Sequence, residues 1–259
     1  MKQVTALIFA AGKLTKDAHE CVDAARLLTP NVIVVHIGGT DQKKAHIEGA
    51  TVHPIDAVPY VEIARSRGIS FVKTPWVFVL DADERMTPKL AQEIKMVLEH
   101  ETSGTATHYQ VPRKNIFAHT KWLRWGGWWP DYQTRLIHTP SIRNWPTRIH
   151  STPSIAGGSA RLKEPFEHYF HGDIHDMAAK TVKYEDIESQ LLFEAGRDSG
   201  TLMFMRKFAG ELYRRLIKGA GFRDGVVGWI ESVYQAYSKT ITYLYLFEKR
   251  YVDNQKNTS

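Results

Sequence analysis

Short apolar runs alternate with amphipathic segments along the first hundred residues, and this alternation predicts strands and helices in turn. We expect strands at residues 4–10, 32–37, 50–53 and 76–80, and helices at residues 17–28, 61–70 and 88–100. Thr87 precedes Pro88, a pair that suits an N-cap followed by the first helical position. Strand–helix alternation of this kind predicts an α/β fold with a mainly parallel, doubly wound sheet.

The rest of the chain has two further patterns. Residues 105–170 are rich in Trp, His, Arg and Pro and contain short β-like pieces at residues 108–112 and 134–137. Helices are predicted after that, at about residues 175–196, 201–218 and 223–250, with the last break at Gly219 and Gly221. We therefore expect a sheet-based domain over residues 1–175 and a C-terminal helical region over residues 176–259.

The composition, with 43% hydrophobic and 24% charged residues, is ordinary for a soluble globular protein. The single cysteine, Cys21, excludes a disulfide within the chain and zinc sites built from several cysteines, and it fits a reducing cytosol. The first residues are apolar but lack a signal-peptide cleavage pattern, and no stretch is apolar enough to span a bilayer. These features predict a cytoplasmic protein.

The net charge of +6 is concentrated near the C-terminus, where residues 201–259 contain ten Lys or Arg against five Asp or Glu. Such an excess predicts an anionic partner: a membrane surface, a phosphate-bearing substrate or nucleic acid. Apolar residues at Val226, Ile230, Val233 and Tyr237 follow helical spacing, as in helices that lie on a membrane surface. Packing of this helix on the sheet domain, or against another subunit in a homo-oligomer, is the alternative interpretation.

Residues 76–88, WVFVLDADERMTP, place Asp81, Asp83 and Glu84 directly after an apolar strand. Charge is costly to bury, so these carboxylates either face water or hold a cation. In doubly wound sheets ligands lie at the carboxyl ends of the strands. Two carboxylates two residues apart offer hard oxygen ligands for Mg²⁺ or Mn²⁺, which can bridge a diphosphate. The alternative is an acidic turn at the start of the next helix.

Several motifs follow one another in a recognisable order. They are VLDADERMTPKL at residues 79–90, GGWWPDYQTRLIH at 126–138, RIHS at 148–151, EHYFH at 167–171 and GFRDGVVG at 221–228. In this order they resemble the motifs of family 2 glycosyltransferases, and within that family the lipopolysaccharide core-biosynthesis enzymes. The resemblance covers about residues 60–251. It implies a Rossmann-like GT-A fold, with a mixed, mainly parallel sheet, flanking helices and a C-terminal helical extension.

The resemblance also implies an activity and its sites. It implies an inverting hexosyltransferase that moves a sugar from a nucleoside-diphosphate sugar to a glycan or lipid-linked acceptor, in the cytoplasm or on the inner face of the cell membrane. It implies a site for Mg²⁺ or Mn²⁺ at Asp83, Asp81 and His168. The implied donor-binding residues are Ala10, Gly39, Asp41, Arg65, Asp81 and Ala82. Nucleic acid is not expected as a partner.

An inverting transfer needs a base that takes the proton of the attacking hydroxyl. Asp131 matches the aspartate of the family's D.Q.RLF motif and is the predicted base; the alternative is a turn aspartate after Pro130. Trp128, Trp129 and Arg135 are predicted at the acceptor, because indoles suit sugar rings and guanidinium groups suit phosphates. Buried core tryptophans and surface ion pairs are the alternatives.

Three positions depart from the family pattern. Ala10-Ala11-Gly12 stands where the family carries Asn-Glu, His36 stands where it carries the first aspartate of the next loop, and Ser151 replaces the glutamate of VHE. These departures leave open a non-catalytic protein that binds nucleotide sugars. Ala10-Ala11-Gly12 is also similar to the Gly-rich loop of sugar nucleotidyltransferases, which is a further alternative.

Overall fold

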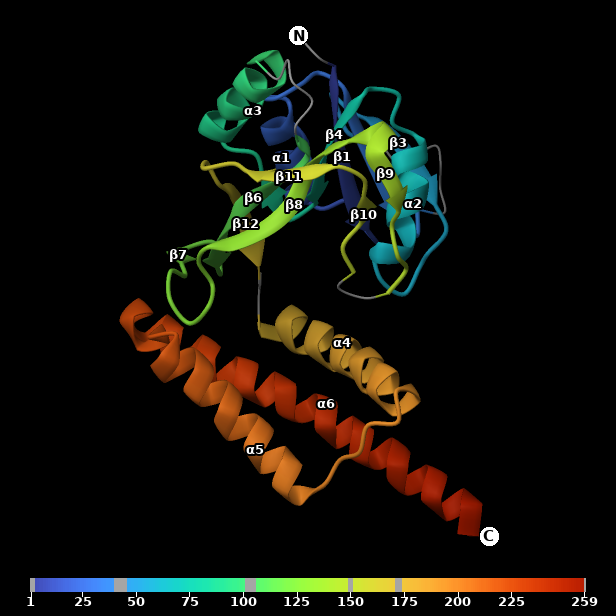
Figure 1. Cartoon of the computed structure of the whole chain (residues 1–259), viewed down its shortest axis with the longest axis vertical. Helices are drawn as coiled ribbons and strands as arrows, with labels where there is room; N and C mark the ends of the chain where they lie inside the picture. The colour runs from blue at the N-terminus through green and yellow to red at the C-terminus, as the bar shows by residue number, and fades with distance from the viewer. Residues whose placement is uncertain (1–2, 40–45, 101–105, 149–150, 171–173, 259) are drawn as a thin grey trace. The chain divides into compact units, whose positions relative to one another are not determined.

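A computed structural model describes residues 3–39, 46–100, 106–148, 151–170 and 174–258 (Figure 1). The chain forms two compact units, each of them discontinuous in sequence. The first unit comprises Met1–Lys114 and Asp131–His168, and the second comprises Asn115–Pro130 and Tyr169–Ser259. The expected functional division between residues 175 and 176 stays a prediction.

The first unit is built on a mixed sheet in which one half is parallel. Four parallel strands lie side by side in the order β3 (Thr51–Ile55), β2 (Val32–Ile37), β1 (Val4–Ala11) and β4 (Trp76–Asp81). β1 and β4 are buried along almost their whole length, as strands covered on both faces must be. These strands match the predicted apolar runs to within two residues, and the predicted α/β fold with a mainly parallel sheet is confirmed.

Helices cover both faces of this sheet (Figure 1). They are α1 (Lys16–Ala25), α2 (Glu62–Ser70) and α3 (Pro88–His100). α1 and α3 share one apolar core with Phe78 of β4, and α2 belongs to the core of the opposite face, where Gly68 leaves room for the ring of Phe9. The Leu90 N–H donates to Thr87 Oγ1 at 3.2 Å, so the predicted N-cap of α3 is confirmed.

Antiparallel strands extend the sheet beyond β4. They are β5 (Glu84–Arg85), β6 (Ala106–Phe117), β7 (Lys121–Trp122), β8 (Asp131–His138) and β12 (Phe166–Phe170), while β11 (Gly158–Arg161) pairs with β6 in parallel. β8 runs antiparallel to β4, with Leu136 opposite Phe78. The amino end of β8 therefore lies at the edge where β4 ends. A second, two-stranded sheet contains β9 (Ile142–Asn144), which follows the 3₁₀ turn η1 (Thr139–Ser141), and β10 (Ser154–Ile155).

The second unit is mainly helical. Its helices are α4 (Ile174–Glu194), α5 (Thr201–Leu212), the π-helical turn η2 (Tyr213–Lys218), the 3₁₀ turn η3 (Gly221–Asp224) and α6 (Val226–Thr258). α4 and α5 each pack against α6, which runs between them in Figure 1. Within the described residues, none of these helices is long and apolar enough to cross a membrane.

The sequence GFRDGVVG forms a tight connection between η2 and α6. A Cβ added at Gly228 would lie 1.9 Å from the carbonyl oxygen of Gly221, so only glycine fits there. Asp224 is buried, and its Oδ2 accepts the backbone N–H groups of Arg124 at 2.9 Å and Trp125 at 2.8 Å. Together with the bond from Gly126 N–H to the carbonyl oxygen of Gly219, these contacts fix residues 124–126 to the helical turn, and the predicted break at Gly219 and Gly221 is confirmed.

Candidate functional site

Asp81, the last residue of β4, is held by two arginines. Arg65 Nη2 donates to both of its carboxylate oxygens, at 2.7 and 3.0 Å, and Arg135 Nη2 lies 3.4 Å from Oδ2. Arg65 comes from α2 and Arg135 from β8, and both are buried. Burial opposes ionisation of Asp81, but the two guanidinium charges outweigh it and hold the pKa of this carboxyl below its ordinary value.

Glu84 completes this buried charge cluster. Its side chain is 1% exposed, it forms a short ion pair with Arg135, and its Oε2 accepts the backbone N–H of Asp81 at 3.0 Å. Burial raises the pKa of Glu84 although Arg135 pulls in the opposite direction. We call Arg65, Asp81, Glu84 and Arg135 the charge frame. It fixes the backbone where β4 ends, a role that the sequence did not suggest for Glu84.

A third arginine, Arg85, holds the turn that follows β4 in place. Arg85 Nη1 donates to the carbonyl oxygen of Ala82 at 2.9 Å, and its Nη2 donates to Asp17 at 2.8 Å and Glu20 at 3.0 Å on α1. The Ala82 N–H in turn donates to the carbonyl oxygen of Phe9 at 3.0 Å. Residues 82–85 are therefore tied to α1 and β1, which keeps Asp83 in one position.

Asp83 and His168 lie together beside the charge frame. His168 on β12 is opposite Glu84 in the antiparallel ladder, and its Nε2 lies 3.7 Å from Asp83 Oδ2. The side chain of Asp83 is 34% exposed and that of His168 is 17% exposed. Two of the three predicted metal ligands are thus brought together, whereas the oxygens of the third, Asp81, face guanidinium groups.

The donor atoms of this pair fit a divalent cation with an incomplete protein shell. Among the residues that the structure describes, no group of three or more His, Cys, Asp or Glu side chains could hold a metal ion. Mg²⁺ and related ions often take only one or two carboxylates and complete their shell with substrate phosphates and water. Because an imidazole is a better ligand for transition ions than for Mg²⁺, Asp83 with His168 fits Mn²⁺ better than Mg²⁺.

Asp131, the predicted base, begins β8. Its Oδ2 accepts from Arg113 Nε at 2.8 Å and Nη2 at 2.7 Å, and its Oδ1 accepts from Gln133 Nε2 at 2.6 Å. These contacts fix the carboxylate in one orientation at the edge where β4 ends. Asp131 and Gln133 lie two residues apart on β8, so their spacing in the sequence was a usable signal for this pair, whereas the pairing with β6 shifts its register at Arg135.

The loops after β1 and β2 are joined by His36. Its Nε2 lies 2.6 Å from the carbonyl oxygen of Gly12, and its ring fills the space where a side chain at Gly39 would lie, 2.3 Å from Nδ1. Ala10 is buried, so only its backbone could face a donor. Asp41 lies outside the described residues. The donor-binding roles predicted for Ala10, Gly39, Arg65 and Ala82 stay predictions.

Trp128 and Trp129 belong to the second unit and are half-buried there. The Trp128 ring stacks on Phe170, with centroids 5.0 Å apart, and the guanidinium of Arg215 lies 5.1 Å from its centroid. Trp129 meets the ring of Trp122 edge-on at 5.3 Å. These rings thus have packing partners within their own unit. Their acceptor role stays a prediction, as does that of Arg135, which the structure places in the charge frame.

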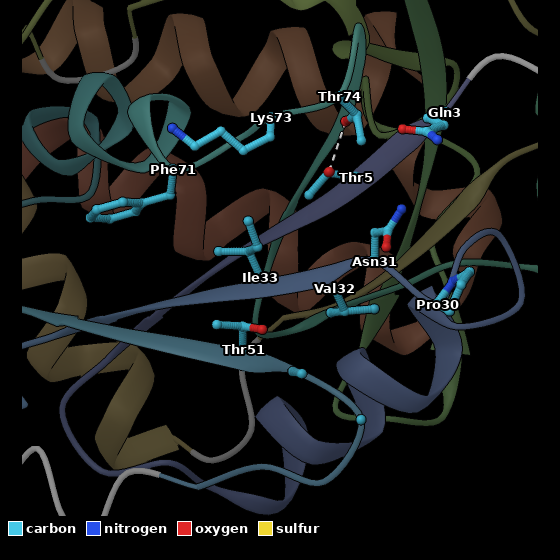
Figure 2. A pocket seen from close by; sticks show the side chains of 12 residues that line it. Gln3, Thr5, Pro30, Asn31, Val32, Ile33, Thr51, Phe71, Lys73 and Thr74 are labelled. Carbon is cyan, nitrogen blue, oxygen red and sulfur yellow. Dashed lines mark hydrogen bonds between the residues drawn. The ribbon is translucent and has the colours of Figure 1, made fainter.

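Two hollows of the first unit differ in position. One, of about 680 Å³, lies at the amino ends of β1 and β2 and is lined by neutral polar side chains such as Thr5, Asn31 and Thr74, with Lys73 as its cation (Figure 2). It lies at the edge opposite Asp83. The other, of about 710 Å³, is lined by Trp145, whose ring lies 5.7 Å from the guanidinium of Arg65. One residue that lines the second hollow, Trp145, therefore lies beside Arg65 of the charge frame.

No protein-family model matches the chain. The chain is similar to an uncharacterized glycosyltransferase of Rickettsia conorii, with 21% identity over 250 residues that span 92% of this chain and 87% of the relative. It is also similar to an uncharacterized glycosyltransferase of Rickettsia bellii, with 20% identity over 250 residues that span 92% and 84% of the two chains. The chain is thus similar, along almost its whole length, to proteins that carry the name glycosyltransferase.

Proposed function

We propose that this protein is an inverting, metal-assisted glycosyltransferase of family 2 type. It would move a sugar from a nucleoside-diphosphate sugar to a glycan or lipid-linked acceptor in the synthesis of bacterial surface polysaccharide or lipopolysaccharide. The observation that carries the proposal is the pair of Asp83 and His168, partly exposed at the carboxyl end of β4 and backed by the buried charge frame. Similarity to two named glycosyltransferases over 92% of the chain supports the reaction class.

Each group of residues has one task in this proposal. Asp83 and His168 would hold Mg²⁺ or Mn²⁺, and the ion would supply positive charge for the diphosphate of the donor. Arg65 and Arg135 keep Asp81 ionised and the turn in place. Asp131, oriented by Arg113 and Gln133, takes the proton of the acceptor hydroxyl as it attacks the anomeric carbon. Bond formation at the face opposite the departing diphosphate inverts the anomeric centre.

The alternative as a sugar nucleotidyltransferase has less support. A Gly-rich loop that cradles phosphates needs free backbone N–H groups. The N–H of Gly12 instead donates to the carbonyl oxygen of Ile37 at 2.9 Å. A pyrophosphate-release assay with nucleoside triphosphates and sugar phosphates distinguishes the two reactions.

Asp83→Asn tests the metal pair directly. In a thermal-shift screen of nucleoside diphosphates with and without Mn²⁺, ligand at a hundred times its dissociation constant should stabilise the wild type by ~2.7 kcal/mol. The variant should keep its fold and lose the Mn²⁺-dependent part of this shift. Asp23→Asn, an exposed aspartate on α1, is the matched control and should behave as the wild type. An unchanged Mn²⁺-dependent shift in Asp83→Asn would remove the basis of the proposal.

Asp131→Asn tests the base separately from donor binding. Loss of a positioned base typically lowers the rate ~100- to 10,000-fold, so sugar transfer should fall by that factor while the nucleotide-induced shift persists. Transfer at a near wild-type rate would make Asp131 a structural partner of Arg113. A protein that binds nucleotide sugars but transfers none, even as wild type, would be the non-catalytic alternative.

A further inference from the structure

The turn that joins α5 to α6 exposes large apolar side chains to solvent. Within the second unit, residues 213–230 comprise η2, η3 and the first turn of α6, and we call them the helical tip. Six of its large apolar side chains are between 45% and 75% exposed: Tyr213, Ile217, Phe222, Val226, Trp229 and Ile230. Soluble surfaces rarely gather so many exposed apolar side chains within one short segment, and such patches mark interaction sites.

The helical tip has exposed basic side chains, whereas its acidic residue, Asp224, is buried. Lys218 and Arg223 are exposed, and the guanidinium of Arg223 lies 4.6 Å from the ring centroid of Trp125, itself an exposed indole. Arg214 is exposed too, but it pairs with Glu211, whose Oε2 accepts from its Nε at 3.0 Å. Asp224 is the acidic residue of this segment, and its carboxylate is buried against the backbone N–H groups of residues 124 and 125. Outward-facing charge on the helical tip is therefore positive.

Two occupants could cover an apolar surface of this kind, a lipid bilayer or a second copy of the chain. A symmetric pair of copies would use the same patch on both partners and would bring Lys218 and Arg223 of each copy toward one another. Like charges at an interface are unfavourable. An anionic bilayer instead offers hydrocarbon to Phe222, Val226 and Ile230, a headgroup zone suited to Trp229 and Tyr213, and phosphates to the cations.

We propose that the helical tip is a membrane-docking site that inserts its apolar side chains into the surface of an anionic bilayer. Binding is reversible, because one short segment gives shallow insertion and no helix of the described residues spans the bilayer. The proposal does not depend on sugar transfer, since its probe is the lipid surface alone. It is narrower than the sequence-based expectation, which spread the membrane contact along α6. Val233 and Tyr237 of α6 are exposed as that expectation requires, but Ile241 is buried, and Lys207 packs over Tyr243.

The electrostatic arm of the test uses flotation of the full chain with lipid vesicles. Wild type should float with phosphatidylcholine–phosphatidylglycerol vesicles at low salt, and far less with phosphatidylcholine alone or at high salt. Each basic residue near an anionic surface contributes a factor of about five to partitioning, so Lys218→Glu with Arg223→Glu should lower it by about 25-fold or more. Lys73→Glu with Lys89→Glu, two exposed lysines of the first unit, is the charge-matched control and should lower it far less.

The apolar arm uses serine substitutions on a single helix. Trp229→Ser should lower binding to the anionic vesicles markedly, whereas Phe247→Ser, an equally exposed aromatic of α6 outside the tip, should not. Far-UV circular dichroism checks that each variant is folded, and Trp229→Gln replaces any variant that is not. The proposal is overturned if wild type stays unbound at the bottom of the gradient with both kinds of vesicle and at both salt concentrations. It is also overturned if the tip variants float as wild type does. It is equally overturned if sedimentation shows a dimer that Trp229→Ser dissociates while lipid binding is absent.

Discussion

The two units bury carboxylates in opposite ways. In the first unit Asp81 and Glu84 face the guanidinium groups of Arg65 and Arg135. In the second unit Glu231 is 1% exposed, and its Oε2 accepts from the neutral amide of Gln235 at 3.3 Å. Burial lifts the pKa of Glu231 to about 7, whereas the guanidinium charges hold the pKa of Asp81 down. Asp81, beside the expected cation site, therefore stays ionised over a wider pH range than Glu231.

The largest effect should come from removing one cation of the charge frame. Arg135→Met leaves Glu84 and Asp81 buried with less compensation, and breaking a buried pair from one side typically costs ~3–5 kcal/mol of unfolding free energy. Urea unfolding followed by circular dichroism measures it. Arg143→Met, an exposed arginine of β9, should cost less than ~0.5 kcal/mol. If Arg135→Met proves as harmless as this control, the first unit does not depend on paired charge.

Glu231→Gln should stabilise the folded protein at neutral and alkaline pH, whereas Arg135→Met should destabilise it. Between about pH 4.5 and 7 the unfolded chain loses the proton of Glu231 while the folded chain keeps it, so stability falls as pH rises and levels off above 7. A pKa difference of this size corresponds to ~3 kcal/mol, which the variant should regain at pH 8 and not at pH 4. Thermal unfolding across this range is the measurement. Glu248→Gln, exposed on the same helix, should leave the pH profile unchanged.

A smaller effect is expected at Asp224, another buried acid of the second unit. Asp224→Ala removes the acceptor of two backbone N–H groups, and because Arg124 and Trp125 are exposed, water replaces part of the loss. We expect ~2 kcal/mol. Hydrogen exchange should show lost protection at the amides of residues 124 and 125. Protection that persists in the variant would mean that the loop holds its conformation without the carboxylate.

The smallest effect should be at an exposed ion pair. Lys249 Nζ lies 2.6 Å from Asp186 Oδ1, but the aspartate is 56% exposed. Surface pairs contribute ~0–1 kcal/mol, so Lys249→Met should change the unfolding free energy by no more than ~1 kcal/mol. A loss comparable to that of Arg135→Met would erase the distinction between charges that are buried and charges that meet water.

Local periodicity explains which elements the sequence could predict. The parallel strands are continuous apolar runs, and the predicted α1, α2 and α3 end within three residues of the observed limits. β6 extends over twelve residues although only a five-residue piece was expected. It contains Arg113 and Lys114, whose charges are balanced by Asp131 and Glu167 on neighbouring strands. A charged strand looks like a loop in the sequence until its partners in other strands are known.

In the candidate site, too, the sequence predicted some neighbours and missed others. Asp83 and His168 were predicted together, because the family resemblance linked two motifs far apart in the chain, and the structure brings them to 3.7 Å. Arg65 and Arg135 were assigned to ligands, which stays a prediction, and the structure shows that both also pair with Asp81. Arg65 lies 16 positions before Asp81 and Arg135 lies 54 after it, so no local pattern could reveal that the three share one ion-pair network.

The interleaving of the two units in the sequence limits how this protein can be dissected. A shortened chain that ended at His168 would keep residues 115–130 and lose Asp224 and Gly219, which accept the N–H groups of Arg124, Trp125 and Gly126. Lost activity in such a truncation would not locate activity in the helices. During synthesis, residues 115–130 likewise leave the ribosome long before Gly219 and Asp224. Their hydrogen bonds to these two residues can form only after residue 224 has emerged.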